Sequence, residues 1–347
     1  MAHRSKVLIV DDSALMRQLL TQIFGADPDL EVVGTAGDPF VARDKIKSLN
    51  PDVLTLDIEM PRMDGLTFLE KLMRAHPMPV VMISSLTDKG ADTTLRALSL
   101  GAFDYVSKPK LDVSNGTIEQ ADEILAKVKA AAKSQVRRRV AAPAPVATTG
   151  KNYQFSATHK VVAIGASTGG TEALKDLLMP LPADFPGIVI VQHMPEAFTH
   201  QFAERLNSLC KIRVKEAQDT DRILPGCALL APGGHQMAVV TKGMEYSVHV
   251  YRGERVNRHL PSVDVLFNSC ARSLGKNVLG VILTGMGNDG ARGMFEMKQN
   301  GAFNIAQDEA SCVVFGMPKE AILLNGVDQV LPLNQIPNAL LKHLAGR

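Results

Sequence analysis

Val161-Val-Ala-Ile-Gly-Ala-Ser-Thr-Gly-Gly170 is the stretch of sequence around which the chain is organised. Its first four residues are apolar, with two valines and an isoleucine, and predict a short buried strand. Apolar residues at helical spacing over residues 171–179 predict a helix directly after it. Ser167 is therefore expected on a tight turn from strand into helix, with its side chain exposed and backbone N–H groups aimed at a ligand.

This turn allows more than one chemical interpretation. Residues 165–169 match Gly-x-Ser-x-Gly, the pattern of a serine nucleophile. The same residues resemble a dinucleotide-binding fingerprint in which Ser167 replaces the glycine that lets backbone approach a pyrophosphate. The third interpretation is a tight turn that has no catalytic or binding role. This stretch alone leaves nucleophile and phosphate loop open.

Length and composition limit the class of protein. The chain has 347 residues, which suggests two domains, and a net charge of +2, which gives no argument for nucleic acid or a membrane surface. We find no signal-peptide core and no apolar run near the ~18 residues of a membrane span, so we expect no membrane insertion. The four cysteines lie far apart and predict reduced thiols in a cytoplasmic protein.

Residues 1–130 predict a first domain in which strands and helices alternate. Strands are expected at residues 6–10, 31–35, 53–56, 80–83 and 105–106, with helical patterns between them. Five such units imply a flavodoxin-like, doubly wound parallel sheet. In sheets of this kind, functional residues gather at the carboxyl ends of the strands.

Five polar side chains follow those strand ends. Asp11 and Asp12 follow the first strand and Asp57 the third, Ser84 ends the fourth, and Lys108 comes after the fifth. Gathered carboxylates repel one another unless a cation is present, and Mg²⁺ prefers oxygen ligands. A hydroxyl, a lysine and Mg²⁺ around one carboxylate suit phosphoryl transfer to that carboxylate. The alternative is a solvated acidic cluster.

These residues resemble the receiver domain of response regulators. The resemblance is carried by Val-Asp-Asp-Ser (10–13), Leu-Asp-Ile-Glu-Met-Pro-Arg-Met-Asp-Gly (56–65), Ser84 and Lys-Pro (108–109). It implies that Asp57 accepts a phosphoryl group from a histidine kinase. It also implies that Ser84 and Lys108 contact that group and that Tyr105 changes position on activation.

The same resemblance implies a magnesium site. Asp12, Asp57 and the backbone carbonyl of Glu59 are the expected ligands, and Asp11 is expected to act through water. Mg²⁺ is then the cofactor of receiver phosphorylation.

Residues 131–159 predict a linker, because alanine, proline and threonine occur there without apolar periodicity. Residues 160–347 predict a second doubly wound α/β domain. Its expected strands are residues 161–164, 188–192, 228–231, 278–283 and 304–306, and its expected helices are 171–179, 196–209, 263–274, 291–300 and 319–324. Residues 237–240 and 246–251 predict an antiparallel hairpin.

A serine nucleophile needs an adjacent base, commonly a histidine oriented by a carboxylate. His193 directly follows a predicted strand, with His235 and His259 as the alternatives. Asp289 lies in a glycine-rich loop after another strand, where a helix cap or a phosphate loop is the other interpretation. Asp264 competes for the carboxylate role, but its position predicts the first turn of a helix.

The order Ser167, His193, Asp289 differs from the serine, aspartate, histidine order of α/β-hydrolases, so that fold is not expected. Triads recur on unrelated folds, so the order does not exclude one. The loop of residues 285–287 places a backbone N–H near Met286, which we expect in the oxyanion hole. Glycines at 285, 287 and 290 are expected to allow close backbone approach.

The second domain resembles the CheB family, the protein-glutamate methylesterases of bacterial chemotaxis. The resemblance is carried by residues 165–170, 192–195, 261–267 and 284–293. It implies a Ser167–His193–Asp289 triad that hydrolyses γ-glutamyl methyl esters on chemoreceptors, usually with deamidation of certain receptor glutamines, and needs no cofactor for hydrolysis. It also implies that the receiver inhibits the hydrolase until it is phosphorylated.

Other classes of function remain as alternatives. A receiver joined to a nucleotide-binding output module would use residues 165–170 as a phosphate loop. A non-enzymatic adaptor would leave the positions of His193 and Asp289 unexplained. A DNA-binding output is weakly supported, because the sequence has no helix-turn-helix tail or basic face.

Overall fold

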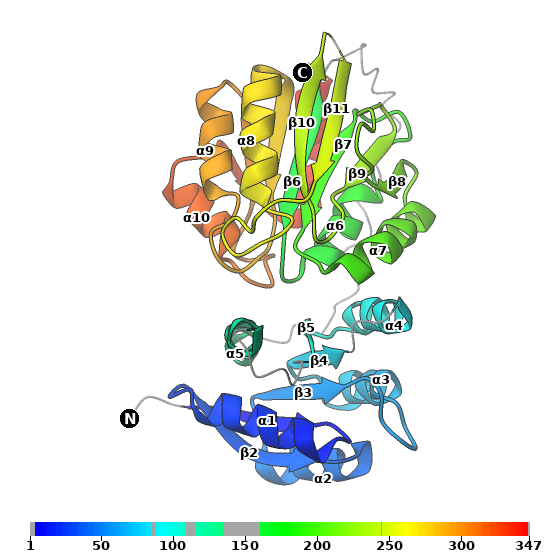
Figure 1. Cartoon of the computed structure of the whole chain (residues 1–347), viewed down its shortest axis with the longest axis vertical. Helices are drawn as coiled ribbons and strands as arrows, with labels where there is room; N and C mark the ends of the chain where they lie inside the picture. Colours follow the sequence, from blue (N-terminus) through cyan, green and yellow to red (C-terminus); the bar gives the residue numbers. More distant parts are fainter. Residues whose placement is uncertain (1–3, 85–87, 109–115, 135–159, 244, 346–347) are drawn as a thin grey trace. The chain divides into compact units, whose positions relative to one another are not determined.

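The computed structural model describes residues 4–84, 88–108, 116–134, 160–243 and 245–345 (Figure 1). The chain divides into two compact units, residues 1–140 and 141–347, which we describe one by one. Among the described residues, no helix is long and apolar enough to cross a membrane.

The first unit is a five-stranded parallel sheet in the order β2-β1-β3-β4-β5. The strands are β1 (Ser5–Val10), β2 (Leu30–Ala36), β3 (Val53–Asp57), β4 (Val80–Ser84) and β5 (Asp104–Ser107). All five expected strands are confirmed, and the order is that of a flavodoxin-like sheet. The central strands β3 and β4 are buried along their whole length.

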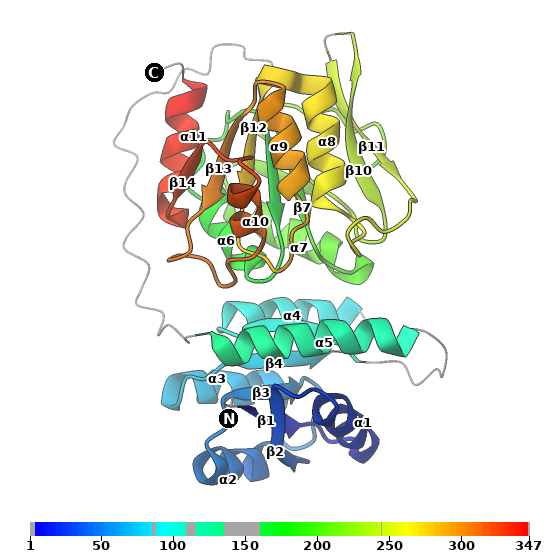
Figure 2. The same cartoon turned by 90° about the vertical axis from the view of Figure 1, so that its left-hand side faces the viewer.

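Five helices cover this sheet. They are α1 (Ala14–Gly25), α2 (Pro39–Leu49), α3 (Gly65–Ala75), α4 (Asp88–Ser99) and α5 (Gly116–Lys133). α1 packs beside α5, and α3 packs beside α4 (Figure 2). Ser13, Asp38 and Asp64 each accept a backbone N–H in the first turn of the helix they precede, which fixes where α1, α2 and α3 begin. α5 extends beyond residue 130, and most of the expected linker lies outside the described residues.

The second unit contains a seven-stranded parallel sheet in the order β14-β13-β12-β6-β7-β9-β8. The strands are β6 (Val161–Ala166), β7 (Ile188–Gln192), β8 (Arg213–Glu216), β9 (Cys227–Leu230), β12 (Val278–Ile282), β13 (Phe303–Gln307) and β14 (Gln329–Leu331). The sequence analysis missed β8 and β14. Both are short edge strands with few buried residues, so they lack the apolar run that identifies the central strands.

Helices and a hairpin complete the second unit. The helices are α6 (Gly170–Leu178), α7 (Glu196–Leu209), α8 (Val263–Leu274), α9 (Ala291–Gln299), α10 (Met317–Leu323) and α11 (Ile336–Leu344), with short 3-10 turns at Gly275–Asn277 and Leu333–Gln335. The expected hairpin is confirmed as β10 (Gln236–Lys242) and β11 (Glu245–Tyr251), which pair antiparallel. It packs against α8 (Figures 1 and 2). Residues of the hairpin and of α8 belong to one buried apolar cluster with the sheet.

The strand order of the seven-stranded sheet determines where Ser167, His193 and Asp289 lie. β6 lies between β7 and β12, and the chain runs outward from β6 to β7 on one side and from β12 to β13 on the other. Connections diverge at such a point, and ligands of open α/β sheets bind there, beyond the carboxyl ends of the strands. Ser167, His193 and Asp289 follow β6, β7 and β12 at this edge.

Candidate active site

Ser167 occupies the expected turn between β6 and α6. Its N–H donates to Thr284 O at 3.0 Å, and its carbonyl accepts from Gly170 N at 2.7 Å. Gly169 precedes the helix with a φ of 78°, a left-handed conformation that favours glycine. The turn is therefore fixed to the neighbouring loop after β12, and the helix N-terminus begins beside the serine.

The pairing of β6 with β7 brings Ser167 and His193 to neighbouring strand ends. Ala166 is the register partner of Gln192, and His193 N donates to Ala166 O at 3.1 Å. The side-chain amide of Gln192, almost fully buried, donates to the carbonyls of Ser167 at 3.0 Å and His193 at 3.1 Å. Gln192 thus fixes the backbone of both residues, a role that the sequence analysis did not predict.

His193 and Asp289 form the expected pair. Nε2 of His193 lies 2.8 Å from Oδ2 of Asp289, with the two side chains 8% and 1% exposed. Nδ1 of His193 is buried and has no hydrogen-bond partner among the described residues. Serine and imidazole are therefore not hydrogen-bonded in this structure, as is common at active sites without substrate. With Nε2 donating to the carboxylate, Nδ1 carries the lone pair that can take a proton.

Asp289 is held as an anion. Besides His193, its oxygens accept from Asn257 Nδ2, Ser262 Oγ, Val263 N and Asp264 N, at 2.7, 2.8, 2.7 and 3.2 Å. Burial raises the pKa of Asp289, but the bond and charge of His193, with the donors Asn257 and Ser262, outweigh it and hold the pKa at about 2. The carboxylate is therefore ionised throughout the neutral range.

The competing residues have other surroundings. Nδ1 of His235 lies 3.2 Å from the carbonyl of Gly233, two residues away. His259 stacks on His193 with ring centroids 3.6 Å apart. Asp264 lies in the first turn of α8, as predicted, where it accepts from Gly293 N and from Asn257 Nδ2, each at 2.7 Å.

The loop after β12 brings backbone next to the serine. A Cβ on Gly285 would lie 2.8 Å from Cβ of Ser167, so only glycine fits there. Among the hydrogen bonds of the described residues, none uses the Met286 N–H, which follows directly. The expectation of close approach holds for Gly285 and for Gly290, whose Cβ would lie 2.5 Å from Val263 Cγ1. Gly287 has a φ of 85°, and no atom of the described residues beyond its chain neighbours lies within 4 Å of the position that a Cβ would take.

The first unit gathers its acidic residues as predicted. Asp11, Asp12 and Asp57 each place one carboxylate oxygen within 4.8 Å of the others. Oδ2 of Asp11 is buried, and no described residue forms a hydrogen bond with it. Burial, followed by the charge of Asp57, raises the pKa of Asp11 to about 6. An orphaned, buried oxygen among mutually repelling carboxylates fits a hard divalent cation such as Mg²⁺.

Asp57 contacts the side chain of Lys108, as expected. Lys108 Nζ lies 2.7 Å from its Oδ2, and the backbone N–H of Glu59 donates to its Oδ1 at 3.3 Å. Burial raises the pKa of Asp57, although the bond and charge of Lys108 oppose the rise. Ser84, 1% exposed, accepts a hydrogen bond from Thr94 of α4 at 2.9 Å. The sequence analysis did not predict Thr94.

Tyr105 is buried on β5, with its ring 5.1 Å from Nζ of Lys127 in α5. Lys127 also donates to the Tyr105 carbonyl at 2.8 Å. Burial, followed by the charges of Asp104 and Glu123, raises the pKa of this phenol. Tyr105 therefore packs as a neutral aromatic next to α5.

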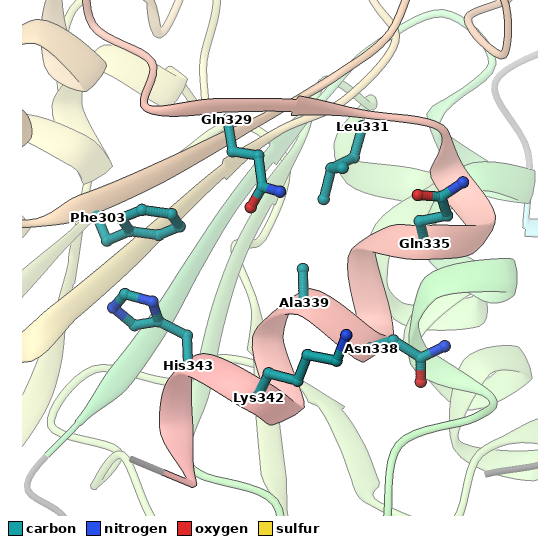
Figure 3. A pocket seen from close by; sticks show the side chains of 8 residues that line it. All are labelled: Phe303, Gln329, Leu331, Gln335, Asn338, Ala339, Lys342 and His343. Carbon is teal, nitrogen blue, oxygen red and sulfur yellow. The ribbon is translucent and has the colours of Figure 1, made fainter. Parts of the chain in front are cut away.

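A pocket of about 420 Å³ lies between α11 and the strands β13 and β14 (Figure 3). Phe303 and His343 stack at one end of it, with centroids 4.1 Å apart. None of the predicted site residues lines this pocket.

Two family models match the chain, one for each unit. A response regulator receiver domain matches residues 7–115, and a CheB methylesterase matches residues 162–340. The chain belongs to the CheB methylesterase family. Nothing in these matches supports a nucleotide-binding output module, so that alternative is set aside.

Curated relatives extend the CheB match to nearly the full length. The protein-glutamate methylesterase/protein-glutamine glutaminase 1 of Geobacter metallireducens is 59% identical, over 96% of this chain and 94% of the relative. The corresponding protein of Salmonella typhimurium is 57% identical, over 98% and 97%. The crystal structure of the Thermotoga maritima CheB methylesterase catalytic domain is 39% identical with a TM-score of 0.52, covering 53% of this chain and 98% of that one.

Proposed function

We propose that the chain is a phosphorylation-controlled serine hydrolase that removes methyl groups from γ-glutamyl methyl esters of chemoreceptors and deamidates certain receptor glutamines. The observation that carries this proposal is the pairing of His193 with buried Asp289 while Nδ1 lacks a partner, at the strand end next to Ser167. The names of the relatives support the substrate class.

The reaction follows from these residues. Ser167 Oγ attacks the ester carbonyl while its proton passes to Nδ1 of His193, and Asp289 stabilises the imidazolium. The Met286 N–H faces the developing oxyanion. The proton then goes to the leaving methoxide, methanol departs, and an acyl-serine remains. Water, deprotonated by the same nitrogen, attacks that ester and releases glutamate and free Ser167. A glutamine substrate loses ammonia in place of methanol.

The receiver part is proposed to accept a phosphoryl group on Asp57 from a chemotaxis histidine kinase. Asp12, Asp57 and the Glu59 carbonyl would hold Mg²⁺, with Asp11 acting through water, and a bound ion would supply positive charge next to the transferring group. Lys108 already contacts the acceptor carboxylate and Ser84 ends the adjacent strand, so both are placed to contact the phosphoryl oxygens. Tyr105 is proposed to change position on activation. The cytoplasm is the expected compartment.

Methanol release from methylated receptor membranes tests the hydrolase proposal. The full chain with a small phosphodonor and Mg²⁺ should release methanol, and Ser167→Ala should not. A serine-directed phosphonate should label the protein at Ser167. Methanol release by Ser167→Ala at the rate of the unmodified protein would contradict the proposal.

A further inference from the structure

One side-chain amide connects the two buried carboxylates of the second unit. Nδ2 of Asn257 lies 2.7 Å from Oδ2 of Asp264 and 2.7 Å from Oδ1 of Asp289. The two carboxyl residues are 4% and 1% exposed. An amide nitrogen carries two protons, so Asn257 donates one to each carboxylate.

A tight turn holds this amide in place. Val256 and His259 exchange backbone hydrogen bonds at 3.0 and 2.9 Å around the two residues between them. Asn257 and Arg258 have φ values of 51° and 70°, and two consecutive left-handed residues define a two-residue hairpin turn in which asparagine is favoured at the first position. His259, at the end of the turn, stacks on His193. The turn therefore contacts both members of the His193–Asp289 pair.

The ionisable groups around the amide come from four elements. They are Asp264 of α8, Asp289 after β12, His193 after β7, which contacts Asp289, and His259 and Arg258 of the turn itself. Two carboxylates this close and this buried resist being ionised together, unless donors stabilise both charges. Asp264 has the Gly293 N–H in addition, and Asn257 is the donor that the two carboxylates share.

We propose that Asn257 is a positioning residue of the hydrolase: by donating to both carboxylates, it keeps Asp289 ionised and aimed at His193 while Asp264 is also charged. This inference rests on the proposed function. Asn257 touches none of the reacting atoms, so its loss should lower kcat with little change in KM.

The pH profile distinguishes this role from a merely structural one. In Asn257→Asp, a third carboxyl enters the site with nearly the same volume. It donates at most one hydrogen bond when protonated, and it adds a buried anion when it ionises. We expect kcat for methanol release by the activated full chain to fall about 10- to 100-fold at neutral pH. The deficit relative to the unmodified protein should widen as pH rises.

Asn257→Ala provides the second variant. At acidic pH, one carboxyl takes a proton and can donate to the other, whereas at alkaline pH two anions face each other without a donor. The loss of kcat in Asn257→Ala, relative to the unmodified protein, should therefore also grow as pH rises. Adding Asp264→Asn to Asn257→Ala removes the opposing charge and should restore part of kcat.

Asn325→Ala is the matched control, because Asn325 is also left-handed, with a φ of 58°, and lies exposed after α10. It should leave kcat unchanged. The inference is overturned if Asn257→Asp or Asn257→Ala folds and loses activity by the same factor at every pH, or loses none. If Ser167→Ala retains activity, the proposed hydrolase function has failed instead.

Discussion

The imidazole rings of His193 and His259 stack face to face, with their centroids 3.6 Å apart and their planes inclined by 8°. The ring of His193 is therefore fixed in two ways, along its edge by Asp289 and on its face by His259. A histidine that must exchange a proton between serine and leaving group benefits from a ring that does not rotate.

Replacing His259 tests the effect of this stack. His259→Ala should lower kcat for methanol release about 2- to 10-fold, the range expected from losing one aromatic contact. His259→Phe keeps a flat ring and should retain most of the activity. If His259→Phe is as impaired as His259→Ala, the nitrogens of His259 matter more than its ring face.

Replacing the triad should be far more damaging. Ser167→Ala and His193→Ala should each lower ester hydrolysis by about 10⁴-fold or more, because either change removes the proton transfer that activates the nucleophile. Asp289→Asn should also reduce hydrolysis, with a smaller effect. His235→Ala is the matched control, since within the described part of the chain His235 bonds to Gly233, two positions away. If ester hydrolysis is lost in His235→Ala and unchanged in His193→Ala, the general base is His235.

Magnesium binding by the receiver should depend on pH. Because the pKa of Asp11 is raised to about 6, the ion must displace a proton below that pH but not above it. Mg²⁺ affinity of the full chain, measured by titration calorimetry, should be constant above about pH 7 and fall as pH drops through 6. Asp11→Asn should bind Mg²⁺ more weakly and lose this pH dependence. An unchanged profile in Asp11→Asn would remove Asp11 from the site.

Phosphorylation should release the hydrolase from inhibition by the receiver. If the inhibited form is favoured by about 1–3 kcal/mol, the fragment of residues 151–347 should hydrolyse about 5- to 150-fold faster than the unphosphorylated full chain. The fragment should not respond to phosphodonor, whereas the full chain should. Asp57→Asn should accept no phosphoryl group and stay slow, because the neutral amide is a poor nucleophile.

The opposite result has a distinct meaning. A fragment no faster than the unphosphorylated full chain would contradict simple inhibition and indicate activation or receptor recruitment by the receiver. Asp44→Asn, at an exposed carboxylate paired only with Arg43 in the described residues, should respond to phosphodonor as the unmodified chain does.

The parts of the fold that the sequence predicted are those with strong local patterns. Continuous apolar runs predicted β6, β7 and β12, and the polar residues at their ends led to the candidate site. β14 was not predicted because it has three residues, two of them exposed. α11 was not predicted, although its apolar residues have helical spacing.

The residues that support the candidate site were not predicted, for a different reason. Gln192 was assigned to its strand and to a motif that carries the CheB resemblance, but nothing local shows that its amide reaches two carbonyls. Asn257 lies 32 positions before Asp289, and their contact follows from where the chain returns to the sheet edge. Asp264 was correctly assigned to the start of a helix. Its connection to Asp289 through the amide of Asn257 could not be predicted from that position. Long-range contacts of this kind carry no periodic signal.

The pairing of Lys108 with Asp57 has an electrostatic consequence for the receiver. Three carboxylates and one ammonium leave two negative charges, which a single divalent cation neutralises, whereas a monovalent cation would leave one. Converting the Asp57 carboxylate to an acyl phosphate then adds about one negative charge to a neutral site. On the proposal that Asp57 is the phosphoryl acceptor, phosphorylation would change the charge at this edge of the sheet by about one elementary charge.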